Sequence, residues 1–140
     1  MVNVRLVSFA SLILRLTLGG LFLAHAAVKL FVFTPAGTAQ FFSSLGLPPT
    51  LAYFSIGWEI AEGVALIAGI WTRVAALAGT LTLFGSIVSV HGPAGFFFSN
   101  PNGGWEFPGL WIVSLFVLAL LGDGALALKP TSFPKTSRNN

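Results

Sequence analysis

Long apolar runs, each interrupted by only a few polar residues, make up most of this sequence. A helix needs about 20 predominantly apolar residues to cross a bilayer. Four stretches approach or reach that length: Val7–Phe31, Leu51–Ile70, Val74–His91 and Phe107–Leu121. Between the first two, Thr34–Pro49 is uncharged and broken by glycine and proline, which favours a short helix around Thr38–Leu45. The pattern therefore predicts an all-α fold, a four-transmembrane-helix bundle with a short interfacial or re-entrant helix between helices 1 and 2.

Composition strengthens the membrane assignment and narrows the chemistry. The chain is 55% hydrophobic and only 8% charged, with a mean hydropathy of +0.88, whereas about a quarter of a soluble domain is charged. Cysteine is absent, which excludes disulfides, thiolate metal sites, iron–sulfur clusters and dithiol redox chemistry within this chain. The basic residues occur singly, so the net charge of +3 indicates topology and not nucleic-acid binding.

The basic residues also predict orientation. With four spans, one side of the membrane receives Arg5, Arg73, Lys129, Lys135 and Arg138. Only Lys29 falls near the other side. Because basic residues concentrate in cytoplasmic segments, we expect a multi-pass protein of the bacterial inner (plasma) membrane with both termini in the cytoplasm. Residues 1–128 would form one membrane domain, and residues 129–140 a polar cytoplasmic tail.

Two acidic residues lie inside the second predicted span. Glu59 and Glu62 are three residues apart, so they share one helical face, and a carboxylate in hydrocarbon costs a few kcal/mol on insertion scales. At about 1.5 Å per residue, Arg15 in the first span lies level with Glu62, which predicts a structural ion pair between them. Glu59 has no cation at its own depth, so it is the stronger candidate for proton transfer or ligand binding.

A second cluster of polar residues is expected near the outer ends of the spans. His25 and His91 lie at similar heights, Lys29 lies slightly above them, and Glu106 enters the fourth span at that level. Convergent polar groups beneath phenylalanine-rich loops favour a ligand pocket in the outer half of the bundle. In this pocket, His25, Lys29 and His91 are candidate ligand-binding residues that would donate hydrogen bonds. Glu59 and Glu106 are candidate catalytic residues that would transfer protons.

Simpler interpretations stand beside these assignments. A single histidine is more often a hydrogen-bonded interfacial residue, and a lysine at a helix end more often an anchor that reaches to the interface. Asn102, followed by two glycines, first indicates a turn and only secondarily a ligand contact. Haem between the histidines, or zinc with Glu106, is disfavoured because the spacing lacks a local ligand motif; no metal is expected.

Several segments together resemble the DoxX family of small bacterial membrane proteins. They are Arg15–Phe31, Phe41–Pro49, Glu59–Arg73 and His91–Pro108. The resemblance implies a four-helix membrane bundle. Members are associated with quinone-linked oxidoreduction, including the membrane part of thiosulfate:quinone oxidoreductases and oxidoreductase complexes in oxidative stress. It also implies that the family's recurrent polar positions are His25, Lys29, Glu59, His91 and Glu106.

The residues and the resemblance lead to the same functional expectation. A quinone head group needs hydrogen-bond donors for two carbonyl oxygens and a route for protons, which the predicted outer pocket offers. Because the chain has no cysteine, the electrons would come from a partner subunit or a bound cofactor. We therefore expect a quinone-binding subunit of a membrane oxidoreductase system. The alternative is a non-enzymatic membrane assembly factor or small-solute carrier with a polar intramembrane core.

Overall fold

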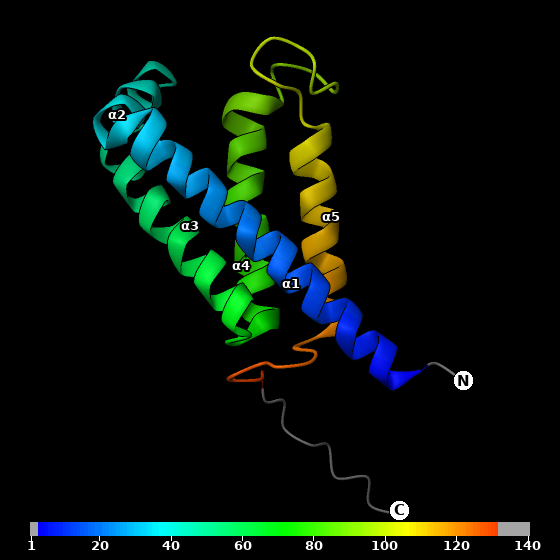
Figure 1. Ribbon diagram of the computed structural model, residues 1–140. Helices are drawn as coiled ribbons and strands as arrows, with labels where there is room; N and C mark the ends of the chain where they lie inside the picture. The colour runs from blue at the N-terminus through cyan, green and yellow to red at the C-terminus, as the bar shows by residue number, and fades with distance from the viewer. Residues whose placement is uncertain (1–2, 132–140) are drawn as a thin grey trace, which may run out of the picture.

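The computed structural model describes residues 3–131, and within that range the fold is helical (Figure 1). The predicted all-α architecture with a short helix between the first two long ones is confirmed. In chain order the elements are α1 (Val4–Ala27), the π-helix η1 (Val28–Val32), α2 (Thr34–Ser44), α3 (Thr50–Ala68), α4 (Thr72–Ser86), the π-helix η2 (Ile87–His91) and α5 (Glu106–Leu121). Helix α2 begins earlier than expected because Pro35 fits the first turn of a helix, where its missing N–H costs nothing.

Among the described residues, three helical segments are long and apolar enough to cross a bilayer: Val4–Val32, Thr50–Ala68 and Thr72–His91. Helix α5 has 16 residues, about 24 Å of rise against a hydrocarbon thickness of about 30 Å, so a fourth crossing stays a prediction. The described ends of the chain lie at one end of the bundle, opposite α2 and the loop between η2 and α5 (Figure 1).

Small residues bring α1 and α3 together. A Cβ on Gly19 would lie 2.8 Å from the carbonyl oxygen of Gly63, and a Cβ on Gly63 would lie 2.9 Å from that of Gly19. Helices approach this closely in membranes where glycine removes the side chain between them. Helices α4 and α5 form a second pair beside them (Figure 1). The Phe22 ring joins the two pairs, since it packs on Gly79 of α4 and lies 4.7 Å from the Trp111 ring of α5.

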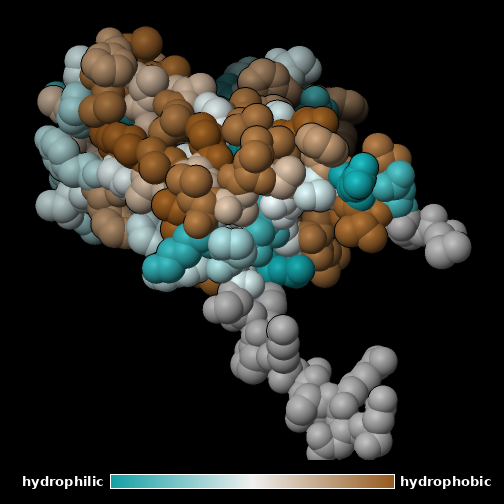
Figure 2. Space-filling model, turned by 60° about the horizontal axis from the view of Figure 1, so that its bottom comes forward, coloured by the Kyte–Doolittle hydropathy of each residue, from teal (hydrophilic) through white to brown (hydrophobic). Residues whose placement is uncertain are grey.

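The outer surface of the helices is apolar, as a lipid-facing surface must be. Leu81, Leu110 and Leu120 are exposed by 74%, 65% and 79%, fractions that would be costly for a protein surrounded by water. Figure 2 shows strongly hydrophobic side chains over much of the visible face and the more hydrophilic ones gathered mainly at its lower and right-hand edges. These observations support a helical membrane protein; the particular membrane and the orientation stay predictions.

Residues 122–131, here called the C-terminal clasp, close one end of the bundle. The clasp donates from Ala125 N–H to the carbonyl of Ser8 and from Leu128 N–H to that of Ala68. Lys129 exchanges backbone hydrogen bonds with the turn between α3 and α4, and its ammonium lies 4.5 Å from the centre of the Trp71 ring. The first residues of the predicted polar tail are therefore attached to the bundle. The remainder of that tail, with Lys135 and Arg138, lies outside the described residues.

Asp123 in the clasp caps the start of α4. Its Oδ1 accepts hydrogen bonds from the Thr72 backbone N–H at 3.2 Å and from the Thr131 hydroxyl at 3.1 Å. Burial by itself would raise the pKa of Asp123, but the hydrogen bonds from Thr131 and Thr72 outweigh it, and the pKa lies below its ordinary value. The carboxylate thus stabilises the N-terminus of α4, where backbone N–H groups lack helical partners.

Candidate functional site

A buried ion pair joins the end of the first long helix to the middle of α3. The Lys29 ammonium lies 2.5 Å from Oε1 of Glu59, and the two side chains are exposed by 21% and 8%. Lys29 stands in η1, the π-helical segment that follows α1, and π-helical turns occur often at functional sites. The expectation that Glu59 lacks a cation at its depth is therefore wrong. Lys29 reaches inward to it instead of extending to the membrane surface.

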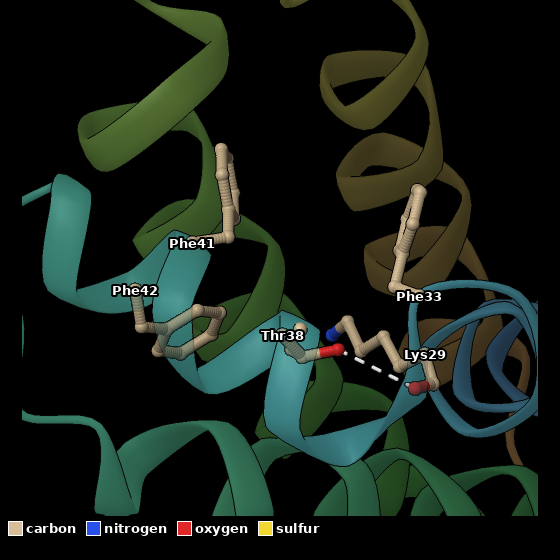
Figure 3. Close-up of a pocket in the computed structure, with 6 residues that line it drawn as sticks. Lys29, Phe33, Thr38, Phe41 and Phe42 are labelled. Carbon is tan, nitrogen blue, oxygen red and sulfur yellow. Dashed lines mark hydrogen bonds between the residues drawn. The ribbon is translucent and has the colours of Figure 1, made fainter.

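The Lys29 side chain also lines a cavity of about 390 Å³. The other lining residues come from the η1–α2 region: Phe33, Gly37, Thr38, Phe41 and Phe42. In Figure 3 the Lys29 side chain extends toward Thr38, while the Phe33 and Phe41 rings project in the same direction from opposite sides of the site. The short helix α2 therefore forms one wall of an aromatic cavity whose charged group is Lys29.

A hydrogen bond from Thr38 links α2 to η1. Within α2 the Thr38 hydroxyl lies 2.9 Å from the carbonyl oxygen of Thr34. It also lies 3.4 Å from the carbonyl oxygen of Lys29, the contact drawn in Figure 3. Thr38 is buried, with 3% of its surface exposed. It fixes the distance between Lys29 and the phenylalanines of α2, which gives the cavity a defined shape.

One oxygen of Glu59 remains without a hydrogen-bond partner. Oε1 binds Lys29, whereas Oε2 is buried and has no partner among residues 3–131. A buried carboxylate oxygen usually has at least one hydrogen-bond partner. This unsatisfied acceptor is the kind of group that a bound water or ligand hydroxyl would complete.

Glu62 has neutral partners and, within residues 3–131, no cation. The Thr82 hydroxyl of α4 donates to it, at 3.2 Å from Oε1 and 3.3 Å from Oε2, and the Trp58 indole one turn earlier also donates. The predicted Arg15–Glu62 ion pair is therefore wrong. In the part of the chain that the structure describes, the salt bridge within 4 Å joins Lys29 and Glu59.

The Arg15 side chain forms its contacts at the end of the bundle that the sequence predicts to be cytoplasmic. It is completely buried, and its Nη2 donates to the carbonyl of Ala125 at 2.7 Å. Gly69, at φ +67°, ends α3 there, and a Cβ on it would overlap Nη1 of Arg15. The guanidinium thus takes the place of a side chain at the C-terminus of α3, where a positive charge is favourable. Asp123 adds an electrostatic attraction.

The two histidines approach each other without sharing a hydrogen bond. The His25 ring lies 5.2 Å from the Trp111 ring and within electrostatic range of Lys29 and His91. The His91 Nδ1 lies 2.7 Å from the carbonyl oxygen of Gly103, which fits an Nδ1–H donor and leaves Nε2 as the remaining ring nitrogen. His25, Lys29 and His91 therefore lie in one region, as the matching heights indicated.

Glu106 and Asn102 lie apart from the Lys29 cavity. Glu106 lines a different cavity of about 410 Å³ together with Phe98, Phe107 and Leu110. Asn102 is exposed and takes a left-handed φ of 69° in the loop before α5, as its interpretation as a turn residue requires. The pocket expected for both Lys29 and Glu106 is thus divided between two cavities. Within residues 3–131, no group of three or more His, Asp or Glu side chains is placed to hold a metal ion.

Sequence reasoning missed the walls of the site and the partner of Glu62. The pair Phe41 and Phe42 in an uncharged, proline-bounded segment was the available signal for the aromatic wall. Thr82 had no such signal, because a threonine in an apolar helix usually bonds to its own backbone. Its contact with Glu62 exists only because α3 and α4 pack side by side.

Comparison with known proteins gives two positive findings. The DoxX family model matches residues 10–92. A Bacillus subtilis (strain 168) protein named "Putative oxidoreductase CatD" is 35% identical over 130 residues, which covers 93% of this chain and 92% of that protein. No solved structure matches the chain significantly.

Proposed function

The chain belongs to the DoxX family, and from this premise we propose that it is a quinone-binding membrane component of an oxidoreductase system. The name of the Bacillus subtilis relative supports the oxidoreductase part of this proposal. The quinone part depends on the cavity at Lys29. A partner subunit would supply electrons, because the chain contains no cysteine that could carry them.

One observation carries the proposal: a lysine paired with a buried carboxylate lines an aromatic cavity within a membrane protein. A volume of about 390 Å³ falls in the range of small-molecule sites, roughly 300–1,000 Å³. A quinone is flat and apolar, with carbonyl oxygens that accept hydrogen bonds. The phenylalanine rings suit its faces, and the Lys29 ammonium has three donors, of which Glu59 takes one.

The residues of this chain would hold and protonate the ligand. A bound quinone supplies a two-electron acceptor, and its reduction takes up two protons. Lys29 would donate to one carbonyl oxygen, and Glu59 would keep the ammonium in position. Phe33, Phe41 and Phe42 would exclude water. His25 and His91, in electrostatic range of Lys29 or each other, are the candidate donors for a second carbonyl oxygen.

Titration of the purified protein in lipid nanodiscs with a quinone analogue tests this proposal. We expect saturable quenching of tryptophan fluorescence, and binding at least tenfold weaker in Lys29→Met. Lys129→Met is the matched control, because Lys129 lies in the clasp at the opposite end and should leave affinity unchanged. Phe41→Leu, which keeps the ion pair, should weaken binding severalfold. Absence of saturable binding, or equal affinity in all variants, would contradict the proposal.

The alternative function, a non-enzymatic membrane assembly factor or small-solute carrier, predicts different experimental results. Copurification of a redox partner or of quinone with the native protein supports the oxidoreductase component. Uptake of a solute into vesicles without any redox change supports the carrier. Neither result depends on the nanodisc titration.

A further inference from the structure

The two buried carboxyl groups of α3 have opposite surroundings. Glu59 faces a cation, whereas Glu62, one turn along, is exposed by only 4% and has only neutral donors in the part of the chain that the structure describes. An ionised carboxylate buried without a cation is very costly, and such a group takes up a proton instead. The two carboxyl groups therefore differ in whether a nearby cation can balance a negative charge.

None of the charged or titratable groups that the structure describes around Glu62 supplies it with a balancing positive charge. Glu59 on its own helix adds a like charge, and Lys29 is engaged by Glu59. Helix α4 offers the neutral Thr82. On α1, His25 packs against Trp111 of α5, and Arg15 contacts Gly69, seven residues beyond Glu62 or about 10 Å along the axis.

From this arrangement we propose that Glu62 is the proton-holding carboxyl of the site, and that it restores a proton to Lys29 through Glu59. The second part rests on the proposed function, because it requires a ligand that takes a proton from Lys29. Glu62 would be a positioning and proton-supplying residue that never touches the ligand.

The proton balance of the step is simple. Lys29 gives a proton to an anionic oxygen of the ligand and becomes a neutral amine. Glu62 then loses its proton, which passes by way of the Glu59 carboxylate to Lys29. The ammonium is restored, Glu62 is left as a carboxylate, and one proton has moved from protein to ligand. The unpartnered Oε2 of Glu59 is the acceptor available for this transfer.

Infrared spectroscopy of the purified protein in nanodiscs tests the first part without any ligand. A protonated carboxyl group has a C=O stretching band separate from carboxylate bands. We expect this band at neutral pH in the wild type and in Glu59→Gln, and its loss in Glu62→Gln. Glu106→Gln, which alters the partly exposed acid at the start of α5, is the matched control and should retain the band. Thr82→Val should shift the band, because it removes a hydrogen-bond donor.

Retention of the band in Glu62→Gln, or its absence from the folded wild type, would overturn the proposal. Addition of the quinone analogue followed by its chemical reduction, which creates the anionic oxygen, tests the second part: the band should disappear in the wild type and persist in Lys29→Met. A band without ligand binding would reject the proposed function and leave Glu62 as the proton holder. Saturable binding without the band would do the reverse.

Discussion

The Lys29–Glu59 ion pair allows a quantitative test of how this bundle holds its charges. Removal of one partner from a buried pair costs about 3–5 kcal/mol, chiefly because the other charge is left uncompensated. Glu59 is the more deeply buried partner, at 8% side-chain exposure against 21% for Lys29. We therefore expect Lys29→Met to lower the free energy of unfolding by about 4 kcal/mol, and Glu59→Gln by about 2 kcal/mol, since the cavity lets water reach Lys29.

The double variant separates the interaction energy between Lys29 and Glu59 from the contribution that each side chain makes through its other contacts. Lys29→Met combined with Glu59→Gln removes both charges of the pair, so the double variant should lose only about 2–3 kcal/mol, a coupling of about 3–4 kcal/mol. Reversible unfolding in mixed micelles with increasing sodium dodecyl sulfate, followed by tryptophan fluorescence, measures each value. Lys129→Met, which removes the exposed cation over the Trp71 ring, should cost at most about 1 kcal/mol. Additive costs of the two single changes would refute the reasoning.

Two further predictions concern the helix contact and the clasp. Gly63→Ala should lower the free energy of unfolding by about 1–3 kcal/mol, because the added Cβ would lie 2.7 Å from the Leu23 side chain; Gly57→Ala, which meets nothing within 4 Å, is the matched control, and equal costs would contradict the close contact. For Asp123, the pKa in the folded protein lies below the ordinary value of 3.8, so its contribution to stability is complete above pH 3.8 and is lost as the pH falls through the folded pKa. The stability difference between wild type and Asp123→Asn should therefore shrink on acidification, and a difference independent of pH would reject this role.

Local patterns were sufficient for the architecture. Apolar runs predicted the long helices, and glycine and proline in Thr34–Pro49 predicted a short helix, observed as α2. These features depend on the hydrophobicity and backbone preferences of neighbouring residues, which follow directly from the residue types in the sequence.

The charge pairing depended on tertiary structure. A rise of about 1.5 Å per residue gives the depth of a side chain in an upright helix, and that arithmetic paired Arg15 with Glu62. It ignores tilt and direction. Helix α1 runs diagonally across α4 and α5 (Figure 1), and the wider π-helical turn of η1 changes the direction in which Lys29 points. Arg15 consequently reaches the end of α3, and Lys29 reaches Glu59.

The sequence by itself thus determined that a few ionisable groups lie inside a small membrane bundle, because apolar runs long enough to cross a bilayer carry them there. Only the tertiary structure decided which carboxyl group receives the cation and which is left with neutral donors. The physical reason is that an ion pair forms or fails over a few ångströms, and helix crossing, α2 and the C-terminal clasp set those distances between residues far apart in the chain.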